Sequence, residues 1–141
     1  MALDLSSLRK AVTALGQTLE RCEDDALLAG LDEVTRNALR AGAIQHFEFT
    51  FELCWKFIQR WLRANLSPED AEFPRTRKEL FRVAARHGLV ADPLPWFEYA
   101  EARNLTSHTY DDDQAARVYE IASRFVVDAQ GLLGQLDARN D

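Results

Sequence analysis

Apolar residues recur every three or four positions near the start of the chain, which is the spacing of one face of an α-helix. These positions are Leu5, Leu8, Val12, Leu15, Leu19, Cys22 and Ala26. Asp4 or Ser6 can cap the start of the helix, and Gly30 and Asp32 mark the turn that follows it. The pattern therefore predicts a first helix over about residues 5–26.

A second, longer helix is predicted from about Asp32 to Asn65, either continuous or beginning as a shorter piece before Gly42. Its wider apolar stripe consists of Ile44, Phe47, Phe51, Cys54 with Trp55, Ile58, and Trp61 with Leu62. A narrower apolar line on nearly the opposite side consists of Phe49, Leu53 and Phe57, flanked by His46 and Arg60. The polar residues between the two, which we interpret as a solvated edge, are Gln45, Glu48, Glu52, Lys56, Gln59 and Arg63.

Two separate apolar faces on one helix need two separate partners. The wider stripe fits the core of the chain itself. The narrower line has two alternative partners, a second copy of the chain or another helix of the same chain. In the first case the dimer interface consists of His46, Phe49, Leu53 and Phe57. The pattern leaves both alternatives open.

All four prolines lie between residues 68 and 95, so no proline breaks a helix in residues 1–67 or 96–141. After Pro74, the capping box Thr76-Arg77-Lys78-Glu79 predicts the start of a third helix. Gly88 is the residue expected just beyond its end.

Asp92-Pro93 predicts the start of a fourth helix, and Asp111-Asp112-Asp113 caps a long last one. The apolar stripe of this last helix consists of Ala115, Val118, Ala122, Phe125 with Val126, Ala129, Leu132 with Leu133, and Leu136. No stretch shows sustained alternation with a period of two. We therefore expect an all-α chain, a single domain over residues 1–141 that forms a four-helix up-and-down bundle with an additional short helix.

The composition fits one globular domain, with 47% hydrophobic and 28% charged residues among 141. A net charge of −6 excludes a protein that coats nucleic acid through bulk positive charge, although it leaves room for a local RNA site. No run of 18 apolar residues occurs, and the N-terminus lacks the pattern of a secretion signal. Cys22 and Cys54 lack metal-ligand spacing. We expect a reduced cytoplasmic protein without a membrane span, metal or cofactor.

Two groups of charged residues each have a plain interpretation and a functional one. Arg75, Lys78, Arg82 and Arg86 share one face of the third helix, and Arg77 adds to the run. A solvated basic face is the usual interpretation, and the alternatives are guidance of RNA or binding of an acidic partner. Glu48 and Glu52 lie one turn apart, as metal ligands do, but they lack an ExxH companion, so we predict no di-metal site.

The joint from Arg103 to Tyr110 is the strongest candidate for chemistry, because polar residues of poor helix propensity interrupt the helical pattern there. Arg103 and His108 lie about 140° apart on a regular helix. Either the helix loosens near residues 106–110, or each side chain meets a partner from elsewhere. Arginine can neutralise a phosphate and histidine can transfer a proton, which is sufficient for RNA cleavage by the adjacent 2′-hydroxyl without a metal. Alternatively, Arg103 pairs with Glu101 or with an aspartate of residues 111–113, and His108 caps a helix.

Two segments resemble the nucleotidyltransferase substrate-binding protein family, a branch of the HEPN superfamily. The first is AGAIQHFEFTFELCWK, residues 41–56, which resembles the long-helix signature of that family. The second is Trp96 followed by Arg103-Asn-Leu-Thr-Ser-His-Thr-Tyr110. It has the Arg-x4-His-x-Tyr form of HEPN toxins that pair with a minimal nucleotidyltransferase antitoxin. The resemblance covers about residues 5–136.

The resemblance implies a HEPN bundle that works as a homodimer and takes RNA as its substrate. Arg103 and His108 match the ribonuclease pair of the family and would face their twins across a dimer cleft. Asn104 matches the polar residue that positions the phosphate or His108. Tyr110 matches the tyrosine that a separately encoded minimal nucleotidyltransferase modifies with AMP, which silences the toxin; a packing tyrosine is the alternative.

Three functions are therefore distinguished. The first is the toxin-type subunit of a HEPN and nucleotidyltransferase toxin–antitoxin pair, a metal-independent endoribonuclease silenced by AMP transfer from its partner. The second is a non-catalytic substrate-binding subunit of a two-part nucleotidyltransferase. The third is a helical dimer whose polar joint only caps helices.

Overall fold

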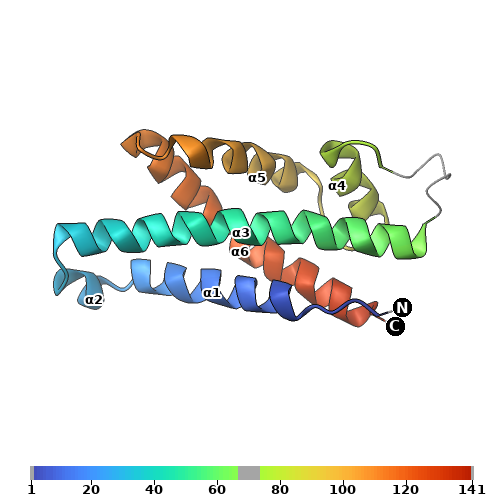
Figure 1. Cartoon of the computed structure of the whole chain (residues 1–141), viewed down its shortest axis with the longest axis horizontal. Coiled ribbons are helices and arrows are strands. Elements are labelled where there is room, and N and C mark those ends of the chain that lie inside the picture. The colour runs from blue at the N-terminus through green and yellow to red at the C-terminus, as the bar shows by residue number, and fades with distance from the viewer. Residues whose placement is uncertain (1, 67–73, 141) are drawn as a thin grey trace.

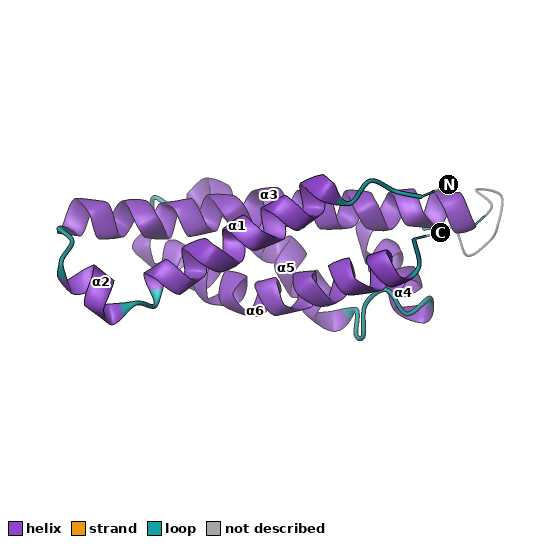
Figure 2. Cartoon of the chain, turned by 90° about the horizontal axis from the view of Figure 1, so that it is seen from below, coloured by secondary structure: helices purple, strands orange, loops and turns teal. Residues whose placement is uncertain are grey.

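The computed structural model describes residues 2–66 and 74–140, and the regular structure of these two ranges is entirely helical (Figure 1, Figure 2). The helices are α1 (Ser6–Cys22), α2 (Asp25–Ala29), α3 (Glu33–Asn65), α4 (Arg77–Arg86), α5 (Leu94–Leu105), the 3₁₀ turn η1 (Thr106–His108) and α6 (Asp112–Ala138). The predicted all-α class is confirmed. Pro68, one of the four prolines used to delimit the helices, lies outside the described residues.

The longest helix, α3, organises the fold because α1, α4, α5 and α6 all pack against it. The colours of Figure 1 show that α1, α3, α5 and α6 run in alternating directions, with α6 crossing behind α3. The short helix α4 lies beside the C-terminal half of α3. The chain ends lie side by side, because Leu3 N donates to Asn140 Oδ1 at 2.7 Å and Asn140 Nδ2 donates to Leu3 O at 2.8 Å.

The first helix ends earlier than its apolar stripe predicts. It stops at Cys22, and Asp24 then accepts a hydrogen bond from Leu27 N at 3.0 Å as the N-cap of a separate helix, α2. Ala26 belongs to α2 and is exposed, so it is not part of the stripe. The structure thus contains a second short helix that the sequence analysis did not predict, because Asp24 restarts the helix where the apolar spacing alone continues.

The other helix boundaries follow the capping residues closely. Asp32 accepts from Thr35 N at 2.7 Å at the start of α3, which continues without a break through Gly42. Thr76 Oγ1 accepts from Glu79 N at 3.2 Å, as predicted for α4. Gly88 follows α4 with φ +77°, a left-handed conformation that suits glycine at this position. Asp92 accepts from Leu94 N at 3.0 Å, so α5 begins one residue beyond the predicted proline.

The core is an aromatic cluster shared by four helices. Its members, each at most 2% exposed, are Phe47 and Phe51 of α3, Phe81 of α4, Trp96 and Tyr99 of α5, and Phe125 of α6. Phe125 is central, with ring centroids of Phe47 and Tyr99 each 5.1 Å away and that of Trp96 5.7 Å away. The wider stripe of α3 therefore faces the core, as predicted, and the cluster holds α5 firmly against α3 and α6.

The narrower apolar line of α3 is not one open face. Phe49 is 54% exposed and Leu53 is half-buried, whereas Phe57 is 1% exposed and has the Arg60 guanidinium 4.9 Å from its ring centre. A spacing of four residues drifts about 40° per step around a helix, so the line turns into the interior of its own chain. Phe57 thus lies beneath the surface, while Phe49 and Leu53 remain with half-buried His46 on the outer side.

Candidate functional site

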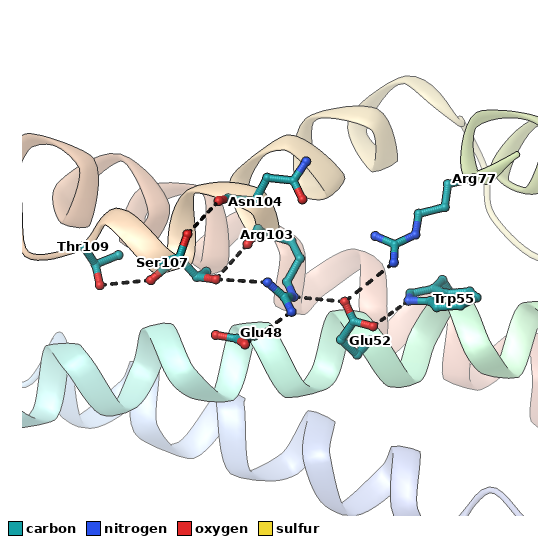
Figure 3. A network of polar contacts seen from close by, with 9 residues as sticks. Glu48, Glu52, Trp55, Arg77, Arg103, Asn104, Ser107 and Thr109 are labelled. Atoms are coloured by element: carbon teal, nitrogen blue, oxygen red, sulfur yellow. Dashed lines mark hydrogen bonds and ion pairs between the residues drawn. The ribbon is translucent and has the colours of Figure 1, made fainter.

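The polar joint begins where α5 stops being an α-helix. After Leu105 the chain tightens into η1, and hydroxyl groups bind the carbonyl oxygens freed there (Figure 3). Thr106 Oγ1 donates to Arg103 O at 2.7 Å, and Thr109 Oγ1 donates to Thr106 O at 3.2 Å. Ser107 Oγ donates to Asn104 O at 3.4 Å. The helix therefore loosens at residue 106, which confirms one of the two expected arrangements.

The Arg103 side chain points from α5 to α3, where two carboxylates bind it (Figure 3). Its Nε donates to Glu52 Oε1 at 2.9 Å, and its Nη2 lies 3.4 Å from Glu48 Oε1. Its Nη1 donates to Thr106 Oγ1 at 3.3 Å. These three contacts hold the guanidinium in one place, and 28% of the Arg103 side chain remains exposed. The alternative partners Glu101 and the aspartates of residues 111–113 are therefore wrong.

Glu48 and Glu52 are the residues that the sequence analysis placed incorrectly, on a solvated edge. Their side chains are only 34% and 25% exposed and both bind Arg103. Glu52 also accepts from Trp55 Nε1 at 2.9 Å and lies 4.0 Å from Arg77 Nη2. Two acids one turn apart beside an apolar stripe were a signal for a buried cation between them, as well as for a metal. Within residues 2–66 and 74–140, no three His, Cys, Asp or Glu side chains gather as a metal site would require.

His108, Tyr110 and Asn104 face outward. His108 ends η1 and is exposed, and its ring centre lies 6.3 Å from that of Tyr110 in an edge-on arrangement. Tyr110 is 86% exposed, so the alternative that it packs in the core of its own chain is wrong. Asn104 is exposed and points away from α3 (Figure 3). His108 caps no α-helix, since the C-cap residue of α5 is Thr106.

A single chain does not bring Arg103 and His108 into contact: in the described ranges no hydrogen bond or ion pair joins them. The motif therefore offers an anchored cation facing α3 and a freely accessible imidazole beside an accessible phenol. Guanidinium N–H groups that the three contacts leave unused can bind a phosphate. The arrangement suits a phosphate-containing ligand that approaches the joint from solvent.

A small pocket adjoins the joint between α3 and the start of α6. Its volume is about 210 Å³, and its lining includes Asn37 and Arg40 of α3 with Thr109 and Asp112. Asp111 next to it accepts from Asp113 N at 2.9 Å, so the predicted capping of the last helix is confirmed. The acids of this corner thus have a role in starting α6, close to Tyr110.

Tyr99 fixes α5 one turn before Arg103. Its hydroxyl donates to Asp128 of α6, and burial, reinforced by this acceptor, raises the pKa of Tyr99 well above its usual value. Burial likewise raises the pKa of the Cys54 and Cys22 thiols. Both cysteines are free, and a buried thiol with a raised pKa is a poor nucleophile. The raised pKa values therefore argue against Cys22 and Cys54 as reactive groups.

None of the helices in the described ranges is both long and apolar enough to cross a lipid bilayer.

Comparison with known proteins places this geometry in context. Residues 3–138 match the family described as nucleotidyltransferase substrate binding protein like. The probable ribonuclease HepT of Haemophilus influenzae is 36% identical over 138 residues, which cover 98% of this chain and 94% of that protein.

Two solved structures have a similar fold. The first, from Haemophilus influenzae and described as the fold of a substrate-binding domain of a nucleotidyltransferase, has a TM-score of 0.88 at 35% identity. The match covers 95% of this chain and 99% of the other. A crystal structure of a Thermus thermophilus protein has a TM-score of 0.61 at 27% identity, covering 86% of this chain and 98% of the other.

Proposed function

Because the chain belongs to the nucleotidyltransferase substrate binding protein like family, we propose that it is the ribonuclease subunit of a HEPN and nucleotidyltransferase toxin–antitoxin pair. One observation carries the proposal: Glu48 and Glu52 hold the Arg103 guanidinium at the joint where His108 and Tyr110 are exposed. The name of the 36% identical relative, a probable ribonuclease, supports the same activity.

The reaction is attack by an RNA 2′-hydroxyl on the adjacent phosphorus. The His108 imidazole accepts the hydroxyl proton as the new oxygen–phosphorus bond forms. The bond to the 5′ oxygen breaks, and that oxygen takes a proton from an imidazolium, supplied by His108 of another copy. Arg103 neutralises the charge that accumulates on the phosphate oxygens, and Asn104 positions the phosphate or His108. The products are a 2′,3′-cyclic phosphate and a 5′-hydroxyl.

The homodimer that this chemistry needs would use the outer side of α3. Phe49 supplies an exposed aromatic ring there, with Leu53 and His46 partly exposed beside it and Phe57 buried beneath. Aromatic residues are enriched in protein–protein interfaces, so the exposed Phe49 ring supports this side of α3 as the contact.

Silencing would act through Tyr110. In this step the phenol oxygen attacks the α-phosphorus of ATP bound to the partner nucleotidyltransferase, pyrophosphate leaves, and the phenol proton passes to a base of that enzyme. Tyr110 is 86% exposed and its ring centre is 6.3 Å from that of His108. An added AMP group therefore brings bulk and negative charge to the imidazole and obstructs RNA.

A second candidate function is a non-catalytic subunit that presents a substrate to the nucleotidyltransferase. The description of the Haemophilus influenzae structure as a substrate-binding domain favours it. In this case Tyr110 is still the acceptor of AMP, but no form of the chain cleaves RNA.

The test is RNA cleavage in EDTA by purified chain whose intact mass shows no adduct on Tyr110. His108→Ala is assayed beside it, with His87→Ala at the distant end of α4 as the matched control. We expect cleavage by the parent and by the control, and a loss of about 10²–10⁴-fold in His108→Ala. If the unmodified parent and both variants fail to cleave several different RNAs, the ribonuclease proposal is wrong and the non-catalytic binding subunit takes its place.

A further inference from the structure

The exposed side of α4 carries a concentration of positive charge in a chain whose net charge is −6. Leu80, Phe81, Val83 and Ala84 are the buried residues of this helix. The exposed cations, which we call the α4 basic face, are Arg75, Arg77, Lys78, Arg82 and Arg86. The single acid of the helix, Glu79, is engaged with the backbone, since its Oε2 accepts from Arg75 N at 2.7 Å.

Three of these cations lie over aromatic rings. Arg77 Cζ is 4.7 Å from the ring centre of Trp55 on α3. Lys78 Nζ and Arg82 Cζ are 5.8 Å and 5.4 Å from the ring centre of Phe97 on α5. In the part of the chain that the structure describes, no carboxylate forms an ion pair with Lys78 or Arg82. The Phe97 ring therefore holds Lys78 and Arg82 in place without neutralising their charge.

The α4 basic face is continuous with the polar joint. Arg77 Nη2 lies 4.0 Å from Glu52 Oε1, the same oxygen that accepts from Arg103 Nε (Figure 3). Along α5, Phe97 and Arg103 are separated by about 9 Å of helix axis. A strand of a few nucleotides can therefore touch the α4 basic face and the joint at the same time.

We propose that the α4 basic face, with Trp55 and Phe97 beneath it, binds the backbone of single-stranded RNA and brings the strand to Arg103. This inference rests on the proposed ribonuclease function, whose substrate path it specifies. The planar guanidinium groups of Arg77 and Arg82, held over rings, offer surfaces on which bases stack and N–H groups that bind phosphates. Charge alone would suffice for an acidic protein, so the aromatic support and the continuity with Arg103 favour RNA.

The experiment compares two double variants that remove the same charge. Lys78→Gln with Arg82→Gln alters the α4 basic face and keeps part of each stem over Phe97. Lys10→Gln with Arg21→Gln removes two exposed cations from α1. Binding of a fluorescent 20-nucleotide single-stranded RNA is measured by anisotropy over a salt series, with His108→Ala in every protein to prevent cleavage.

We expect the α4 double variant to bind RNA roughly tenfold more weakly at low salt, and the α1 double variant to bind within about twofold of the reference. The slope of log K against log salt should become shallower by about 1.4, the loss of two single-strand phosphate contacts. Equal binding by the two double variants would overturn the proposal. The proposal would also be overturned if the α4 double variant lost binding of polyglutamate but retained binding of RNA, since the face would then bind an acidic protein.

Cleavage separates this inference from the function on which it rests. With His108 intact, the α4 double variant should lose about tenfold in kcat/KM on long RNA. It should cleave a dinucleoside monophosphate as fast as the parent, because that substrate is too short to reach α4. A chain that cleaves no RNA but binds it through α4 would refute the ribonuclease and support the RNA surface. If His108→Ala abolishes cleavage but the α4 double variant cleaves every substrate as fast as the parent, the ribonuclease is supported and the RNA surface on α4 is refuted.

Discussion

The two ends of α5 illustrate two ways of using side chains. At the N-terminal end, Trp96 and Tyr99 are buried against Phe125, and their partners all belong to the same chain. At the C-terminal end, Arg103 is anchored to α3, while His108 and Tyr110 face solvent. The first end is complete in one chain, whereas the second presents reactive groups that only another molecule can use. Stability and function should therefore respond to different substitutions.

Phe125→Ala should have the largest effect on stability. The ring contacts Phe47, Phe51, Trp96 and Tyr99, and its removal leaves a cavity where α3, α5 and α6 meet. We expect a loss of about 3–5 kcal/mol in the free energy of unfolding, measured by urea denaturation. Cleavage per folded molecule should stay near that of the parent. A stability loss below about 1 kcal/mol would show that the cluster does not hold α5.

Arg103→Ala should lower both cleavage and stability, because Arg103 belongs to the joint and is also anchored to α3. It removes the cation that we propose binds the phosphate, and it leaves Glu48 and Glu52 with only the more distant Arg77, 4.0 Å from Glu52, as a counter-charge. We expect cleavage to fall by about 10²–10³-fold and stability by about 1–3 kcal/mol. Arg103→Lys keeps the charge and should recover more stability than activity, because lysine lacks the planar fork. Parallel recovery of both would make Arg103 a structural residue.

Tyr99→Phe tests the point where the two ends meet. The variant keeps the ring in the cluster but loses the hydroxyl that donates to Asp128, so stability should fall by about 1–2 kcal/mol at neutral pH. In the parent, burial raises the pKa of Tyr99 and of Tyr119, so both stay neutral in the fold when unfolded tyrosine ionises near about pH 10.

The stability of the parent should therefore be fully present below about pH 10 and decrease as the pH rises above it. In Tyr99→Phe this decrease in stability should be smaller, and the part that remains comes from Tyr119, which is still present. Urea denaturation at pH 8 and pH 11 measures the difference. An identical decrease in parent and variant would mean that Tyr99 is not the group held neutral.

Tyr110→Phe should have the smallest effect on the chain alone. The side chain is 86% exposed, so stability should change by less than about 0.5 kcal/mol and RNA cleavage should be unchanged. With the partner nucleotidyltransferase and ATP, the variant should gain no AMP by intact mass and should remain active. An AMP adduct on Tyr110→Phe would move the modification to another residue.

The sequence predicts the core better than the joint. Apolar spacing along α3 and α6 places Phe47, Phe51 and Phe125 correctly, because burial of apolar groups depends mainly on helical periodicity. Capping residues predict most helix ends correctly, because each cap binds backbone groups only a few residues away in the sequence. The exception is α2, where Asp24 starts a new helix inside a continuing apolar pattern.

The partners of Arg103 were beyond the reach of such local rules. Glu48 and Glu52 are more than fifty residues away from it in sequence, and only the packing of α5 on α3 brings them together. The run of polar residues of poor helix propensity and the Arg-x4-His-x-Tyr motif identified the joint, but neither carried information about what anchors the arginine. Long-range pairing of charges thus required the three-dimensional structure.

The most direct test of the separation between core and joint is to measure RNA cleavage and unfolding on one preparation of His108→Ala. His108 is exposed and is not part of the aromatic cluster. The account predicts a cleavage rate reduced by at least about 100-fold and a free energy of unfolding within about 0.5 kcal/mol of the parent. A variant that cleaves as fast as the parent, or that loses activity only in proportion to its folded fraction, would contradict it.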